Sequence, residues 1–138
     1  MLEKGISEEA ANKSIQKAND AFPDALVTNY ESLIQHLELP DEDDRHVLAA
    51  AIKTNANIIV TNNVRDFPEA YLQSFGLSAK SADDFLTDII DLNPQQTVDA
   101  FKEMVSHKKN PPLDEYEVLS QLRKIGLNDT ANYLHALL

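Results

Sequence analysis

The hydrophobic and polar positions in the middle of the chain predict a helix followed by a strand. The helix covers residues 40–52, and small or apolar side chains recur at helical spacing here and just beyond. These positions are Val47, Ala50, Ala51 and Thr54. Residues 58–60 form a continuous β-branched run, which is typical of a strand covered on both faces. Because only residues 53–57 connect the two, we expect the helix to turn back, so that its start lies beside the end of the strand.

Oxygen-bearing side chains stand at the two ends that this geometry brings together. Asp43 and Asp44 open the helix, whereas Thr61, Asn63 and Asp66 follow the strand. The carboxyl edge of an α/β sheet is where such sheets bind ligands. Several oxygen ligands in one place suit a hard cation such as Mg²⁺ or Mn²⁺.

A structural interpretation of the same residues also stands. Asp and Glu in the first turn of any helix are favoured by capping and by the helix dipole. Asp66 could likewise cap the short helix expected after Phe67-Pro68. The composition of these two stretches leaves both interpretations open.

The remaining pattern is mainly helical. Capping residues and turn signals predict helices that begin near residues 7, 69, 81, 93, 114 and 128. Residues 25–28 are compatible with a short strand or a loop, and residues 77–79 with an edge strand. Asp83 and Asp84 are interpreted as capping residues of the helix that they open. Two apolar stripes should face inward, and they comprise Phe85, Leu86, Ile89 and Ile90 in one helix and Val98, Phe101, Met104 and Val105 in the next.

The composition limits the classes of protein to which this chain can belong. The chain has 138 residues, of which 43 % are hydrophobic and 25 % charged, as in a soluble globular domain. It contains no cysteine, and no signal peptide or membrane-spanning segment is visible, so a reducing cytoplasm is expected. The net charge of −11, with 12 scattered cations, argues against a general nucleic-acid binder and favours a basic partner. The one basic stretch, residues 107–109, suits either a phosphate contact or a helix-end charge before a linker.

Two motifs carry a resemblance to a known family. Pro-Asp-x-Asp-Asp-Arg-His-Val-Leu-Ala-Ala-Ala, from residue 40, is followed by Ile-Val-Thr-x-Asn-x-x-Asp-Phe-Pro, from residue 59. Together they resemble the second half of a PIN domain, and more narrowly the bacterial relatives of VapC-type toxins. The likeness extends over residues 22–86 and, more weakly, through residues 110–112. It implies an α/β/α parallel-sheet fold over residues 1–92, with residues 93–138 as a helical extension of α-hairpin type.

The resemblance also implies roles for individual residues. In such proteins acidic side chains hold Mg²⁺ or Mn²⁺ for the hydrolysis of RNA. Asp44 matches the ligand at the helix start, with Asp43 beside it, and Asp66 matches the last acidic group. Asn63 and Thr61 match polar groups of the same site. Arg45 and His46 are candidates for contacts that support these carboxylates, with a solvent-facing His46 as the alternative.

The chain departs from the family pattern at its start. PIN domains open with a strand that carries an essential Asp, followed by a further acid on a helix, and Met1-Leu2-Glu3-Lys4-Gly5 matches neither. One expectation is therefore a toxin ribonuclease that needs an N-terminal PIN half, or another PIN chain, to complete its site. A basic antitoxin is a second possible partner, and RNA would bind only to the assembled form. The alternative is a catalytically inert PIN remnant that acts as an interaction or regulatory protein.

Overall fold

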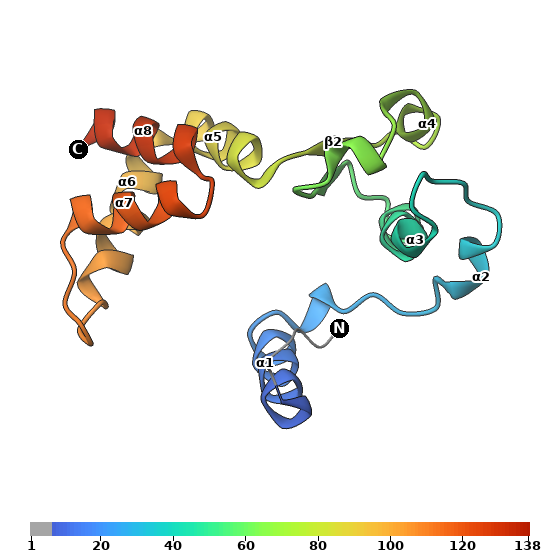
Figure 1. Ribbon diagram of the computed structural model, residues 1–138, viewed down its shortest axis with the longest axis horizontal. Helices are drawn as coiled ribbons and strands as arrows, with labels where there is room; N and C mark the ends of the chain where they lie inside the picture. The colour runs from blue at the N-terminus through green and yellow to red at the C-terminus, as the bar shows by residue number, and fades with distance from the viewer. Residues whose placement is uncertain (1–6) are drawn as a thin grey trace. The chain divides into compact units, whose positions relative to one another are not determined.

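The structure is a computed structural model, and it describes residues 7–138. Figure 1 shows the helices and strands along the chain. The opening at residues 1–5, where a departure from the family pattern was expected, lies outside the described residues. The chain forms two compact units, one that ends at Ala56 and one that covers residues 57–138. Helices predominate, and the second unit also contains a small parallel sheet. The predicted α/β class is therefore confirmed.

The first unit is helical. Its elements are the α-helices α1 (Glu8–Ala21), α2 (Glu31–Ile34) and α3 (Arg45–Lys53), and the 3₁₀ helices η1 (Pro23–Ala25) and η2 (Glu42–Asp44). Ser7 caps α1 by accepting a hydrogen bond from the Ala10 N–H, as its sequence predicts. No strand forms at residues 25–28, because Pro23 starts the 3₁₀ turn η1 and the residues after it pair with nothing.

The buried face of α3 differs from the predicted stripe. Leu48 and Ala49 are fully buried and Ala51 is nearly so, while Thr54 is exposed. Val47 and Ala50 are only half-buried. Leu48 is a larger apolar side chain than any in the predicted stripe, and its burial removes the most apolar surface from water. The predicted stripe is therefore correct at Ala51, wrong at the exposed Thr54, and lacks the two most buried residues, Leu48 and Ala49.

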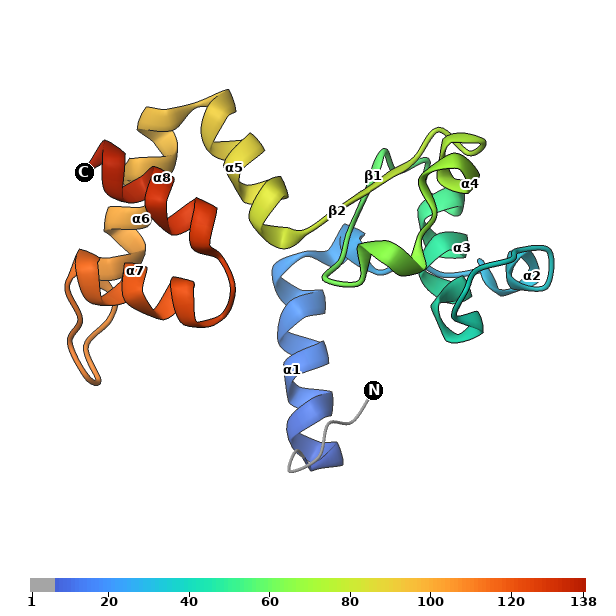
Figure 2. The same cartoon turned by 45° about the horizontal axis from the view of Figure 1, so that its top comes forward.

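The second unit begins with the sheet. Strand β1 (Ile58–Val60) pairs in parallel with β2 (Ser78–Lys80), with Ile58 opposite Ser78, and the Thr61 N–H donates to the Lys80 carbonyl at 2.9 Å. Figure 2 shows the two strands side by side. Between them lie η3 (Val64–Asp66) and α4 (Glu69–Gln73). The predicted edge strand is thus confirmed, one residue later than expected.

Strand β1 is not covered on both faces. Ile59 is buried, but the side chain of Val60 is 46 % exposed. Among the described residues β1 pairs with one strand only. A two-stranded sheet has small faces, and other elements pack against little of their area.

Four helices complete the second unit: α5 (Ala82–Leu92), α6 (Pro94–Ser106), α7 (Glu115–Lys124) and α8 (Asn128–Leu137). Figures 1 and 2 show them packed together. Their shared core consists of Ile90, Phe101, Val105, Val118, Leu119, Ala131 and Leu134. Two residues of the predicted inward stripes point outward instead, since Ile89 is 39 % and Met104 42 % exposed. Both line an apolar pocket beside the core residues Ile90 and Phe101.

Asp83 caps a different helix from the one predicted. Ser81 caps α5 by accepting from the Asp84 N–H. The Asp83 carboxylate instead accepts from the N–H groups of Asp129 at 3.0 Å and Thr130 at 2.8 Å, and from the Thr130 hydroxyl at 2.6 Å. The residue before α8, Leu127, has no side-chain cap of its own. Asp83 therefore supplies the N-terminal cap of α8 and ties α5 to it.

Truncation of Leu119 is expected to destabilise the helical core. Leu119 is fully buried, so Leu119→Ala should leave a cavity and lower the free energy of unfolding by about 3 kcal/mol. Urea unfolding followed by circular dichroism measures this change. Leu92→Ala is the matched control, because Leu92 is 81 % exposed and should change stability by less than about 0.5 kcal/mol. Equal losses in both variants would contradict this core.

Candidate metal centre

The turn before α3 gathers four consecutive acidic residues, 41–44. The Asp41 carboxylate accepts from the Asp43 N–H at 2.9 Å and thereby caps η2. The Asp44 N–H in turn donates to the Asp41 carbonyl at 3.1 Å. Asp41 is exposed and Asp44 half-buried. These backbone contacts fix the positions of both carboxylates within one turn.

Arg45 and His46 support this turn through its backbone. The Arg45 Nε–H donates to the Glu42 carbonyl at 3.0 Å. The His46 Nδ1 lies 2.6 Å from the Asp43 carbonyl and donates to it. Both side chains therefore hold the 3₁₀ conformation that presents the aspartates.

The turn after β1 is equally well defined. The Thr61 hydroxyl oxygen accepts from the Asn63 N–H at 3.0 Å. The Asp66 N–H donates to the Asn63 carbonyl at 2.9 Å, and the next residue, Phe67, is buried and anchors the end of η3. Residues 62–66 line a small pocket of about 210 Å³. Asp66 is half-buried in this turn.

Capping does not account for two of the candidate carboxylates. Asp44 precedes α3 but makes no side-chain capping bond to it. Asp66 does not cap α4 either, because that helix begins after Pro68 without a side-chain cap. Of the three aspartates Asp41, Asp44 and Asp66, only Asp41 caps a helical turn.

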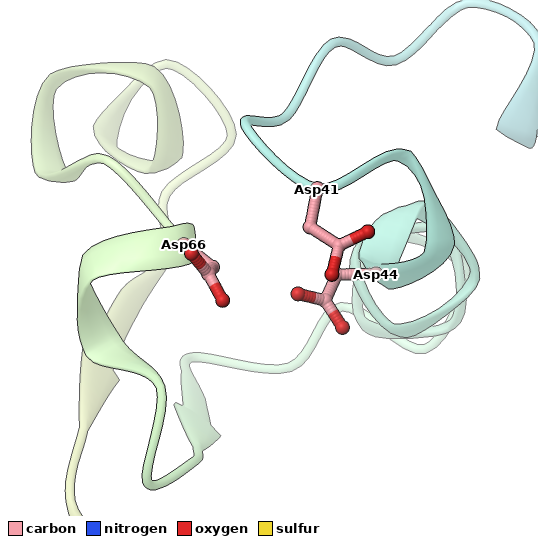
Figure 3. A group of neighbouring side chains, drawn as sticks. All are labelled: Asp41, Asp44 and Asp66. Atoms are coloured by element: carbon pink, nitrogen blue, oxygen red, sulfur yellow. The ribbon is translucent and has the colours of Figure 1, made fainter.

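Asp41, Asp44 and Asp66 form an acidic group that could hold a metal ion. Figure 3 shows their side chains, with Asp41 and Asp44 projecting from the same turn. Asp43, which the sequence predicted as a ligand, is not part of this group, and the group contains Asp41 instead. A signal for Asp41 was available, since side chains three residues apart lie above one another in a 3₁₀ turn. Asp41 and Asp44 have that spacing, whereas Asp43 and Asp44 do not.

Two known protein families match different parts of the chain. The PIN domain family matches residues 1–65, and the family described as the VapC50 C-terminal domain matches residues 82–136. The chain is therefore similar to PIN-domain, VapC-type proteins. The second match runs from the start of α5 almost to the end of α8, so the four-helix part of the chain is the segment that corresponds to that domain.

One curated VapC-type protein is similar over most of this chain. A Mycobacterium tuberculosis (strain ATCC 25618 / H37Rv) protein with the name "Putative ribonuclease VapC50" is 35 % identical over 109 residues. The match covers 76 % of this chain and 64 % of that relative. No solved structure matches the chain. Within residues 7–138, none of the helices has the length and apolar character that crossing a membrane requires.

Proposed function

We propose that this chain supplies part of the active site of a metal-dependent endoribonuclease, the toxin of a toxin–antitoxin pair. The PIN-domain and VapC-type relationship gives the class of reaction. The observation that carries the proposal is the acidic group of Asp41, Asp44 and Asp66, whose carboxylates could together hold one metal ion.

The donor set suits Mg²⁺ or Mn²⁺. Three carboxylates and no nitrogen or sulfur ligand form a hard, anionic site, which is the chemistry that these ions prefer. When bound, such an ion lowers the pKa of a coordinated water and polarises a phosphoryl oxygen. The run of carboxylates at residues 41–44 repels itself in the absence of a cation, and this repulsion favours cation binding.

Two polar residues of the second unit would orient the substrate. The Thr61 hydroxyl oxygen already accepts a hydrogen bond from the Asn63 N–H, so its own proton remains to be donated to a phosphate oxygen or a water. Asn63 is the residue before η3, the turn that contains Asp66, and its side-chain amide offers donors of the same kind. Both groups would position RNA, while the aspartates would hold the ion.

A partner chain is part of this proposal. Within the described residues β1 pairs on one side only, and an open strand edge is a template for another strand. We infer that a PIN-type segment from a second polypeptide, or a further copy of a PIN chain, pairs there and completes the site. The net charge of −11 suits a basic antitoxin as a further partner. The cytoplasmic location inferred from the absence of cysteine stays a prediction.

An RNA cleavage assay tests the proposal. The chain is assayed with Mg²⁺ or Mn²⁺, alone and after co-expression with the polypeptide encoded beside it. We expect cleavage in the co-expressed sample, abolished by EDTA and restored by either ion. A stable complex that cleaves no RNA would overturn the ribonuclease proposal in favour of an inert interaction protein.

A further inference from the structure

A basic surface without carboxylates in its lining lies where α6 ends and α7 begins. The whole chain has 23 acidic residues and 12 lysines and arginines, so acidic side chains are expected at most surface hollows. Two pockets beside α6 and α7 are lined by lysines and by no Asp or Glu side chain. The first, of about 420 Å³, is lined by residues 107–111 together with Leu113 and Gln121. The second, of about 400 Å³, lies between α6 and α7, and its rim includes Lys108, Gln121 and Lys124.

The two pockets are neighbours. They share Lys108 and Gln121, and neither is lined by an Asp or Glu side chain. Lys109 stands in the first pocket and Lys124 in the second. The two neighbouring pockets, taken here as one groove, therefore present three ammonium groups and the side-chain amides of Asn110 and Gln121.

Stabilisation of the end of α6 does not explain these lysines. The helix dipole interacts favourably with cations in the last helical turn, but the last turn of α6 contains no basic residue. His107 is the C-terminal cap and lies 4.0 Å from the Glu103 carboxylate. Lys108 and Lys109 come after the helix has ended. Within the part of the chain that the structure describes, neither lysine forms an ion pair.

The backbone that holds the lysines is anchored at both ends. Lys109 forms an antiparallel bridge with Pro112, and Leu113 packs against the helical core. Asp114 then joins Glu117 in a capping box that starts α7. A loop with fixed ends loses less conformational entropy when it binds a ligand, and this lowers the cost of binding.

We propose that this groove, which we call the basic groove, binds the phosphate backbone of single-stranded RNA. Lysine ammonium groups bind phosphate as point charges, and the amides of Asn110 and Gln121 add hydrogen-bond donors. Met104 and Ile125, which are 42 % and 73 % exposed, line the second pocket and offer apolar surface to a base or ribose. The inference rests on the proposed ribonuclease function, and it assigns the four-helix part a role in holding substrate.

A binding assay without divalent metal tests the basic groove separately from cleavage. The full chain is titrated into fluorescein-labelled decauridylate in EDTA, and fluorescence anisotropy is followed at several salt concentrations. The test variant is Lys108→Ala/Lys109→Ala. The matched control is Lys13→Ala/Lys17→Ala on α1, which removes the same charge from two exposed lysines.

We expect the test variant to bind about 10-fold more weakly at low salt. The slope of log affinity against log salt should fall by about 1.4, since each phosphate contact on a single strand contributes about 0.7. The control should bind like the unmodified chain. Equal weakening in both variants would overturn the proposal, because net charge alone would then explain binding.

Two further results separate this inference from the proposed function. Decaglutamate that binds as tightly as the RNA, with the same dependence on Lys108 and Lys109, would reassign the groove to an acidic protein and overturn the RNA proposal. RNA binding that depends on these lysines in a chain that never cleaves RNA would support the groove while the nuclease proposal fails. If the Lys108→Ala/Lys109→Ala variant cleaves RNA and binds it in EDTA as well as the unmodified chain does, the groove proposal fails while the nuclease proposal stands.

Discussion

Asp44→Asn is expected to reduce metal-dependent RNA cleavage by the assembled protein by about 100-fold or more. Loss of a group that merely supports a metal ligand already costs about 10- to 100-fold in affinity or activity, so loss of a ligand should cost at least as much. Asp66→Asn should have the same effect, because both residues belong to the acidic group. Initial cleavage rates at saturating Mn²⁺ measure the change, and isothermal titration with Mn²⁺ shows whether binding of the ion is lost with it.

The control for this prediction lies in the same turn. Glu42→Gln removes the same charge from η2 but leaves the Glu42 carbonyl, which is the group that Arg45 contacts. Its cleavage rate should stay within about 3-fold of the unmodified protein, as expected for an exposed charge outside the site. Normal cleavage by Asp44→Asn, in a protein that still assembles, would remove Asp44 from the site.

Titration with Mn²⁺ also tests whether Asp41 or Asp43 binds the metal ion. The metal group of the structure contains Asp41, whereas the sequence motif pointed to Asp43. Asp41→Asn should weaken Mn²⁺ binding more than Asp43→Asn does, because Asn can still cap η2 while losing the anionic ligand. A larger loss in Asp43→Asn would favour the sequence motif over this geometry.

The second large effect is expected at Asp83. Asp83→Ala should lower the free energy of unfolding by about 2 kcal/mol, since it removes the cap of α8 and leaves the Thr130 hydroxyl without its carboxylate acceptor. Thr130 is buried, so water cannot easily replace that acceptor. Asp83→Asn keeps an acceptor oxygen and should lose about half as much. Urea unfolding at pH 7 measures both variants.

Asp84→Ala is the matched control. Asp84 is the neighbouring aspartate in the same first turn of α5, and it is exposed. Its backbone N–H, which bonds to Ser81, is kept in the variant. Its loss should be below about 0.5 kcal/mol. A loss as large as that of Asp83→Ala would mean that negative charge at the start of α5, not the cap of α8, provides the stability.

The contribution of Asp83 should also depend on pH. Desolvation of the Asp83 carboxyl raises its pKa, but the hydrogen bonds from the Thr130 hydroxyl, the Thr130 N–H and the Asp129 N–H outweigh it and lower the pKa below the ordinary 3.8. A carboxyl with a lowered pKa in the folded state stabilises the fold above its ordinary pKa. The stability difference between the unmodified chain and Asp83→Ala should therefore be constant near pH 6 and shrink as pH falls below 3.8. A difference that grows in acid would contradict this assignment.

Local sequence predicted most of the element boundaries. The caps Ser7, Asn93 and Asp114 bond to N–H groups three residues ahead, so the residues that define each helix start lie next to one another in the chain. Gly76 ends its short helix in the left-handed region, with φ of 72°, as a glycine at that position predicts. The helix-to-strand motif of residues 40–68 likewise pointed to the correct family, because its two parts have a characteristic separation.

Tertiary structure decided what depends on residues far apart in the chain. The Asp83 carboxylate could have capped α5, and it bonds to α8 because the fold brings in N–H groups 46 and 47 residues away. Ile89 and Met104 stay partly exposed although local spacing places them on the inward stripes, and neither belongs to the core that the four helices share. The sequence by itself thus determined which residues begin and end the helices and which family motif is present, since those features rest on local hydrogen bonds. Only the folded chain decided which carboxylate caps which helix and which apolar side chains are buried, because each of these requires a partner that the local pattern does not contain.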